Sequence, residues 1–454
     1  MNYRIFYLII ILFHYAGVSA MAQMGSTGRT AEALQFSLEQ AQAYAYENNY
    51  DLKNSGIDVD IARKMVKQNT SIGLPQIDAG IDYMDYFLQP TTLIPGEFFG
   101  QPGTYQPITF GTKYNTTLKG TVTQLIYSGQ YLVGLQTARA FLETSHQKNV
   151  RDKVDVRDQV ADAYIRLLVV DEGIKILDSI HVVISKLVEE TRKSYLAGLI
   201  EDIEVDQAEL NKSNLEATIT YTKNLRSLGY ASLKFIIGLK DNQELVQTDD
   251  LEFFLNGINR DALISQQFDY RSNLDYLLLK KADYLTLMQY KLARTAYQPT
   301  LSAFLTGSTN AQRNTWNFLN TSKVWYPTVN FGISLHIPIW SSGSRKYSVD
   351  QARLNVEKSK VTNEKMRVGL ELQYATAKTE FKNSYELYQN KLKGFQTALK
   401  IYTKTMEKYK QGMAGSTDLN QRYNQFLISN NDYVQSIYTL LSQKIKLNKL
   451  LDKY

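Results

Sequence analysis

The sequence has 454 residues, of which 44% are hydrophobic and 21% charged, a composition typical of a folded chain and not of a disordered tail. Lys and Arg exceed Asp and Glu by only 51 to 45 and form no basic block, so we expect no nucleic acid as partner. The absence of cysteine excludes disulfides, thiol nucleophiles, cysteine-ligated metals and an acylated N-terminal cysteine, and only four histidines remain for other metal or acid–base chemistry.

The first residues have the pattern of a secretory signal peptide. Arg4 supplies a positive charge, Ile5–Phe13 is an unbroken apolar run, and Ala20-Met21-Ala22 offers a cleavage site. The apolar run is about half of the ~20 residues that a membrane-spanning helix needs. We therefore expect residues 1–22 to be removed on export, leaving a mature chain that is not lipidated.

Two short segments then alternate apolar and polar residues, from Ile77 to Tyr83 and from Leu118 to Thr123. This alternation indicates strands with one apolar and one polar face, at about 76–88 and 113–127. The loop between them, from Gln89 to Thr112, is rich in Pro, Gly and aromatic residues, and we expect it to face outward.

A helical hairpin is predicted over residues 129–239. No proline interrupts the segment from Gln130 to Tyr195, and apolar residues recur there at alternating steps of four and three. A single helix of this length would reach about 100 Å at 1.5 Å per residue. Ser128 is a candidate N-cap, and Gly198 marks a tight turn into a returning helix.

The second half of the chain repeats the first. The same offset of 214 residues separates the pairs Ser128/Ser342, Tyr195/Tyr409 and Gly198/Gly412. The repeat predicts strands at about 299–309 and 326–340, and a second helical hairpin over 343–452 with Ser342 as its N-cap. Upstream, Pro75 and Pro299 are 224 residues apart, so the first copy has a loop ten residues longer.

Four amphipathic strands cannot close a barrel, because the smallest bacterial barrels have eight and an open edge in lipid leaves backbone groups unpaired. Two chains would give eight strands, whose interior is filled by side chains. Three chains would give twelve strands and leave a passage. The sequence therefore predicts a membrane α+β protein: a homotrimeric 12-stranded transmembrane β-barrel, four strands per chain, continued by long coiled-coil helices.

The order helix–strand–strand–long helix–helix, present twice, closely resembles the TolC-type outer-membrane efflux proteins of Gram-negative bacteria. The resemblance implies a homotrimer in outer-membrane lipid with a periplasmic helical extension. It also implies two repeats, at 23–239 and 263–454, with an equatorial-type linker at 240–262. Its members dock onto a periplasmic adaptor and an inner-membrane pump of the RND, ABC or major-facilitator type.

In this family, acidic side chains ring the periplasmic aperture. Asp418, six residues after Gly412, matches the first acid of the motif, whereas Gln421 stands where some members have a second. Glu204 follows Gly198 by the same interval. Three carboxylates converging on one axis would attract cations. The alternative is that Asp418 only stabilises the start of its helix, where a carboxylate is favoured anyway.

The tips of both hairpins are the expected contacts for the adaptor, since they lie where a pump must meet the tunnel. The residues concerned are Gly198, Leu199, Gly412, Met413 and Gly415. Turns are also often small for purely steric reasons, and that alternative stays open.

The leading hypothesis is a passive outer-membrane conduit of a tripartite efflux system, not an enzyme and without cofactor or metal. Nucleotide-binding and hydrolase motifs are absent from the sequence, so transport energy must come from a partner. The alternatives are the exit duct of a type I protein secretion system and a periplasmic adaptor. An adaptor would have one hairpin, whereas this chain has two.

Overall fold

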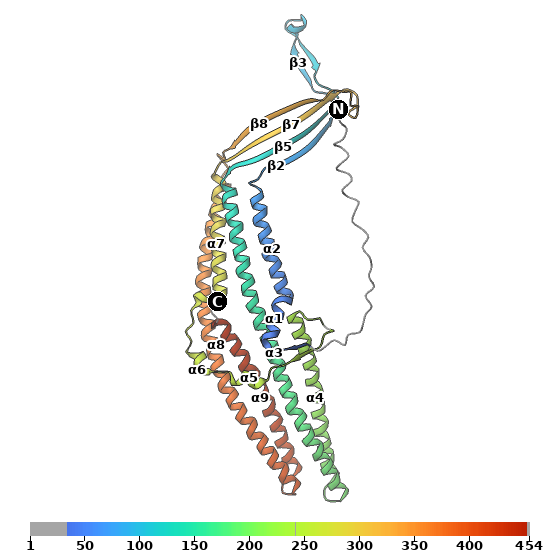
Figure 1. Cartoon of the computed structure of the whole chain (residues 1–454), viewed down its shortest axis with the longest axis vertical. Helices are drawn as coiled ribbons and strands as arrows, with labels where there is room; N and C mark the ends of the chain where they lie inside the picture. The colour runs from blue at the N-terminus through green and yellow to red at the C-terminus, as the bar shows by residue number, and fades with distance from the viewer. Residues whose placement is uncertain (1–33, 241, 452–454) are drawn as a thin grey trace.

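The computed structural model describes residues 34–240 and 242–451, so the predicted signal peptide lies outside the described residues. The chain forms a long rod, with a four-stranded sheet at one end and two helical hairpins whose tips lie together at the other (Figure 1).

The sheet has the antiparallel order β2-β5-β7-β8. Its strands are β2 (Gln76–Asp85), β5 (Tyr114–Ser128), β7 (Thr300–Arg313) and β8 (Tyr326–His336). One row of residues across all four strands is Ile77, Val122, Leu305 and Phe331. The next row, on the opposite face, is Asp78, Thr121, Thr306 and Asn330. One face is therefore apolar and the other polar, and the apolar face is solvent-exposed in the single chain, with 77% of Ile77 and 69% of Phe331 accessible.

The long loop of the first copy contains a β-hairpin that the sequence analysis did not predict. Strands β3 (Thr91–Pro95) and β4 (Tyr105–Thr109) pair around the 3-10 helix η2 (Gly96–Phe99) and project beyond the sheet (Figure 1). Each strand carries a proline, Pro95 or Pro107, which removes a ladder donor and hides the strand from pattern reading.

Two of the helices run without interruption from the sheet to the tips. Helix α3 (Gly129–Leu196) returns as α4 (Asp202–Ile237), and α8 (Ser344–Lys410) returns as α9 (Ser416–Leu451). Ser128 caps α3 as predicted, accepting a hydrogen bond from the backbone N–H of Tyr131. The prediction for Ser342 is wrong. Gly343, with φ of 86°, holds the N-cap position of α8 without a side-chain bond, and Ser341 accepts the Arg345 N–H instead.

Shorter helices lie beside α3 and α8 and complete a layer of helices. In this layer α2 (Tyr50–Ser71) and then α4 lie outside α3, while α7 (Leu274–Arg294) and then α9 lie between α3 and α8. Near the sheet the order is α2, α3, α7, α8, and near the tips it is α4, α3, α9, α8 (Figure 1). Asn49 caps α2 and also donates to the carbonyl of Ile236, so α2 continues the line of α4. The layer and the sheet thus share two lateral edges, one formed by β2, α2 and α4 and the other by β8 and α8. At the tips themselves the layer folds together, and α4 and α8 meet through Glu204 and Tyr409.

Small elements surround the middle of the rod. Strand β1 (Leu34–Phe36) pairs in parallel with β6 (Leu245–Gln247), beside the helices α1 (Leu38–Asn48), α5 (Leu251–Asn256) and α6 (Arg260–Ser265). The 3-10 turns η3 (Tyr270–Ser272) and η4 (Thr295–Tyr297) flank α7. Tyr164 is fully buried in the core here, and its hydroxyl donates to the Phe36 carbonyl at 2.9 Å, tying β1 to α3. Among the described residues, no helix has both the length and the apolar character required to traverse a bilayer.

Candidate aperture at the hairpin tips

Both hairpins turn by the same helix-ending motif. Gly198 and Gly412 have φ of 74° and 73°, a left-handed conformation that glycine adopts without steric cost. The N–H of Leu199 donates to the Ser194 carbonyl at 3.0 Å, and that of Met413 donates to the Lys408 carbonyl at 2.8 Å. Leu199 and Met413 remain 75% and 65% exposed, so both turns present an apolar side chain to the outside.

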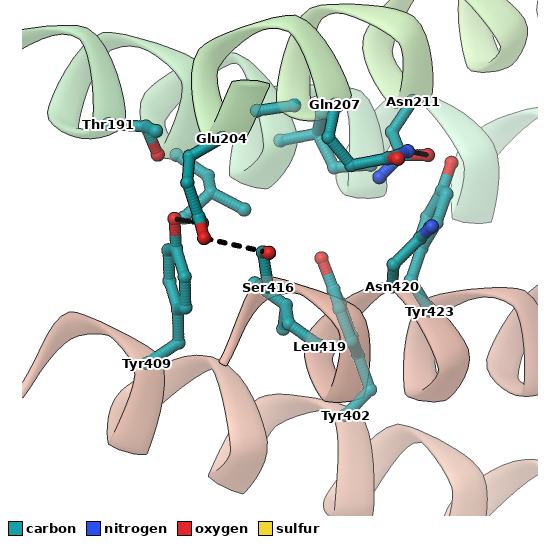
Figure 2. Close-up of a pocket in the computed structure, with 13 residues that line it drawn as sticks. Thr191, Glu204, Gln207, Asn211, Tyr402, Tyr409, Ser416, Leu419, Asn420 and Tyr423 are labelled. Carbon is teal, nitrogen blue, oxygen red and sulfur yellow. Dashed lines mark hydrogen bonds between the residues drawn. The ribbon is translucent and has the colours of Figure 1, made fainter. Parts of the chain in front are cut away.

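Glu204 joins the two hairpins of one chain. Its carboxylate accepts a hydrogen bond from the Tyr409 hydroxyl at 2.8 Å and a second from the Ser416 hydroxyl at 2.9 Å (Figure 2). Glu204 lies in the first turn of α4, Tyr409 in the last turn of α8, and Ser416 begins α9. One half-buried carboxylate therefore holds the start of α4 against both helices of the other hairpin.

The environment of Tyr409 keeps it in the donor form. Burial and the adjacent Glu204 carboxylate together raise the pKa of Tyr409 to about 12, because both disfavour a phenolate. The phenol therefore keeps its proton at any neutral pH and continues to donate to Glu204.

A small cavity of about 30 Å³ lies beside this carboxylate, between α3, α4, α8 and α9 (Figure 2). Its lining includes Thr191 and Tyr423, whose hydroxyl oxygens are buried without a hydrogen-bond partner among the described residues. A cavity of this size accommodates a water molecule, and polar groups without partners favour one. At the tips, the hairpins thus meet across a small polar site beside the hydrophobic cluster that they share.

Asp418 lies in the first turn of α9, with its carboxylate 3.1 Å from the Arg422 Nε on the same helix. Both side chains are nearly half exposed. The structure does not join Asp418 to Glu204, whose partners are Tyr409 and Ser416. Sequence reasoning missed these two partners, although Tyr409 was already visible as the repeat counterpart of Tyr195.

Three of the five predicted docking residues, Leu199, Gly412 and Gly415, line a groove at the tips, whereas Gly198 and Met413 do not. The groove has a volume of about 770 Å³ and is lined by Leu199, Tyr409, Gly412 and Gly415, among others. A Cβ atom added at Gly415 would meet no atom within 4 Å, and the Gly415 backbone is not left-handed. Gly198 and Gly412 are required by backbone conformation, whereas Gly415 is not.

Comparison with known proteins finds one matching protein family and several solved structures of similar fold. Residues 285–452 match the protein family described as Outer membrane efflux protein. No curated protein matches the sequence.

Similar solved structures cover nearly the whole chain. CusC, described in connection with transmembrane channel formation, has a TM-score of 0.71 at 14% identity over 95% of this chain and 96% of that one. The Campylobacter jejuni CmeC outer membrane channel has 0.67 at 17% identity over 91% and 85%. The Neisseria gonorrhoeae MtrE outer membrane channel, in an open state, has 0.68 at 17% identity over 91% and 88%. At these identities the likeness is one of fold. With the family match in the second repeat, it confirms that the chain resembles the TolC-type outer-membrane efflux proteins.

Proposed function

We propose that this protein is the outer-membrane channel of a tripartite efflux system, a passive conduit from the periplasm to the exterior. The observation that carries the proposal is the sheet, in which apolar residues align in rows across four strands on one face while polar residues align on the other. Such a wall has lipid on one side and water on the other. The sheet argues against an adaptor, whereas a secretion duct would share it; the match to the family described as Outer membrane efflux protein favours efflux.

The oligomer follows from the free edges. Strands β2 and β8 each have one edge without a partner among the described residues, and such edges in lipid must be paired. Head-to-tail pairing of β8 with β2 of the next copy closes a ring, and three copies give a 12-stranded barrel with a lumen. The same closure brings α8 against α2 and α4 of the next copy and forms the periplasmic helical barrel.

The organisation along the chain follows the predicted repeats. Residues 1–22 are the signal peptide, 23–239 and 263–454 the two repeats, and 240–262 the linker at the equator. The mature protein then sits in the outer membrane with its helices in the periplasm, where an adaptor and an inner-membrane pump couple to the tips.

Trimer formation and conductance test the proposal together. The purified mature protein is expected to migrate on a gel as a heat-modifiable trimer, to fractionate with the outer membrane, and to conduct in a planar bilayer. A soluble or monomeric protein that is electrically silent in a bilayer would contradict it.

The Glu204 tie is expected to keep the tips closed. Glu204→Gln weakens two hydrogen bonds to a charged acceptor, each of which contributes about 1.5–3 kcal/mol. Conductance should therefore rise, while Glu201→Gln, an exposed neighbour outside the tie, should behave as the native protein. If both variants conduct equally, the prediction that Glu204 keeps the aperture closed is wrong.

Asp418 remains the candidate aperture residue, and its Arg422 partner sharpens the test. If three copies of Asp418 line the pore, Asp418→Ala lowers cation selectivity, and Arg422→Gln raises it by freeing the carboxylate. If neither variant changes selectivity, Asp418 only stabilises the start of α9.

Gly415 provides the cleanest test of adaptor docking. Gly415→Phe needs no left-handed backbone and its Cβ meets open space, so its effect is expected to report on the partner. Loss of adaptor cross-linking with native conductance supports docking at the tips, and unchanged cross-linking and efflux would exclude it. Gly198 and Gly412 serve less well, since any substitution strains their backbone.

A further inference from the structure

Another cavity lies at the middle of the rod, where α1, α3, α5 and α9 meet (Figure 1). Its volume of about 280 Å³ is close to the lower end of the range of about 300–1,000 Å³ that is typical of small-molecule sites. Helices α3 and α9 are inner helices of the layer, so the cavity lies away from both lateral edges, where the next copy would pack. All of its walls therefore come from one chain.

Apolar side chains form most of the wall. Leu38 comes from α1, Ile165 from α3 and Phe254 from α5, while α9 contributes Leu441 and Ile445. Ile165 and Leu441 belong to the hydrophobic core of the rod, and the other three pack against it. The wall is therefore held in place by the core, and a hydrocarbon chain placed against it is removed from water.

Lys444 brings a positive charge to this cavity. Its ammonium group forms no ion pair or hydrogen bond with another residue that the structure describes, and burial lowers the pKa of Lys444 because it disfavours the charged form. Arg157 and Asp158 also line the cavity, but they pair with each other at 3.0 Å and together add no net charge. A partly buried ammonium group without a counterion costs free energy, so the cavity attracts an anion.

Asn448 limits the kind of anion that fits. It follows Lys444 by one helical turn on the same face of α9, and its side chain lines the cavity without a hydrogen-bond partner among the described residues. One ammonium group and one neutral amide donor match a group with a single negative charge and two acceptor oxygens, which describes a carboxylate. The second negative charge of a phosphate would be repelled by Asp158 in the same wall.

We propose that this cavity binds a small amphipathic carboxylate. Lys444 and Asn448 bind its charged group, and its apolar body packs against Phe254. The bound molecule touches α1, α3, α5 and α9 at once, so it holds the small elements at the middle of the rod against the long helices. The site goes beyond the proposed function and does not depend on it, because every residue of the site belongs to one chain.

Binding of hexanoate to the purified protein tests the proposal. Lipid nanodiscs avoid detergent micelles, which would take up the probe, and calorimetry measures the affinity. Hexanoate should bind saturably, and acetate, whose chain is shorter by four methylene groups, should bind about a hundredfold more weakly. Hexylamine, which has a similar chain and the opposite charge, should not bind. Absence of saturable hexanoate binding, or hexylamine binding of equal strength, would overturn the proposal, and tighter binding of hexyl phosphate would overturn the choice of a carboxylate.

Variants of α9 locate the binding. Lys444→Met keeps the length of the side chain but removes its charge, and should weaken hexanoate binding about tenfold to a hundredfold, the effect of a lost hydrogen bond between charged groups. Asn448→Leu removes a neutral donor and should weaken binding about fivefold. Lys446→Met, at an exposed position of the same helix, is the matched control and should bind hexanoate as the native protein does. Equal affinity of Lys444→Met and the native protein would show that hexanoate binds elsewhere and would overturn the proposal.

Discussion

The two helical hairpins have matching lengths and the same connection, but they differ inside. The hairpins share one hydrophobic cluster, and the buried side chains that α3 and α4 contribute to it are aliphatic: Leu177, Ile180, Ile184, Leu187, Leu215 and Ile219. The interior of α8 and α9 is a stack of rings formed by Tyr388, Phe395, Tyr402, Tyr423, Phe426 and Tyr433. Successive ring centroids there lie between 5.0 and 6.2 Å apart.

The surfaces of the two hairpins also differ, in the number of ion pairs that join their helices. Three ion pairs cross between α3 and α4, namely Arg192–Glu209, Lys223–Asp178 and Arg226–Asp171, and a hydrogen bond joins His181 to Glu216. Within the described residues, Lys391–Asp432 is the pair that crosses between α8 and α9. Surface ion pairs are thus more numerous between the helices of the first hairpin, whereas stacked aromatic rings join the helices of the second. A rod of fixed length constrains where its helices begin and end, but leaves open which interactions hold them together.

The largest expected loss of stability follows from a substitution that removes one ring from the aromatic stack. Phe426 is 1% exposed and lies between Phe395 and Tyr402, so Phe426→Ala should cost about 3–5 kcal/mol of stability. Hydrogen exchange should quicken in α8 and α9. Leu215→Ala, at an equally buried position of the first hairpin, should quicken exchange in α3 and α4. If either variant affects both hairpins alike, their interiors form one cooperative unit and the comparison fails.

Alkaline pH should loosen the tie between the hairpins. The pKa of Tyr409 is raised from its usual value of 10.0 to about 12, so the folded protein holds the phenol proton more tightly than the unfolded chain. The corresponding stability is fully present below pH 10 and is lost as the pH rises through 12. Conductance should therefore rise over that interval. Tyr409→Phe should lack the step, and a step that persists in Tyr409→Phe would assign it to another group.

A smaller gain is expected from Lys444 in α9. Burial lowers the pKa of this lysine, and no described residue forms an ion pair with it, so its charge is a cost to folding. Tyr230 occupies the same position of the first repeat and bonds Asp171. Lys444→Met should add about 1 kcal/mol of stability. The exposed Lys446→Met is the control and should leave thermal unfolding unchanged.

The smallest effect concerns the surface ion pairs. Lys223→Gln breaks an exposed pair of the first hairpin and should cost about 0.2–1 kcal/mol at low salt, and less at 1 M salt. The loss is measured as a shift in thermal unfolding at both salt concentrations. A loss that does not change with salt would show that Lys223 acts through packing of its stem.

Much of the fold is readable from the sequence because its signals are periodic. The seam of α3, the amphipathic strands and the turns at Gly198 and Gly412 each follow from local patterns. The hairpin of β3 and β4 is not readable, because its prolines break the pattern of a strand. Ser342 was misjudged because the structure places Gly343 at the N-cap in a left-handed conformation, which the repeat alone does not reveal.

The site was readable only in part. The spacing after each tip glycine identified Glu204 and Asp418, and the Asp418–Arg422 pair, four residues apart, was available from helical spacing but was overlooked. The partners of Glu204 were not available, since Tyr409 lies 205 residues away and reaches it only through the packing of one hairpin on the other.

The uninterrupted course of α3 and α8 from sheet to tip limits how such a chain can change in length. One added residue in α3 would turn everything beyond it by about 100° and carry its buried stripe out of phase with α4. Seven added residues bring the stripe back to within about 20°, provided that the facing helices and the second repeat lengthen as well. The length of the helical rod is therefore set in steps of whole heptads taken together in both repeats.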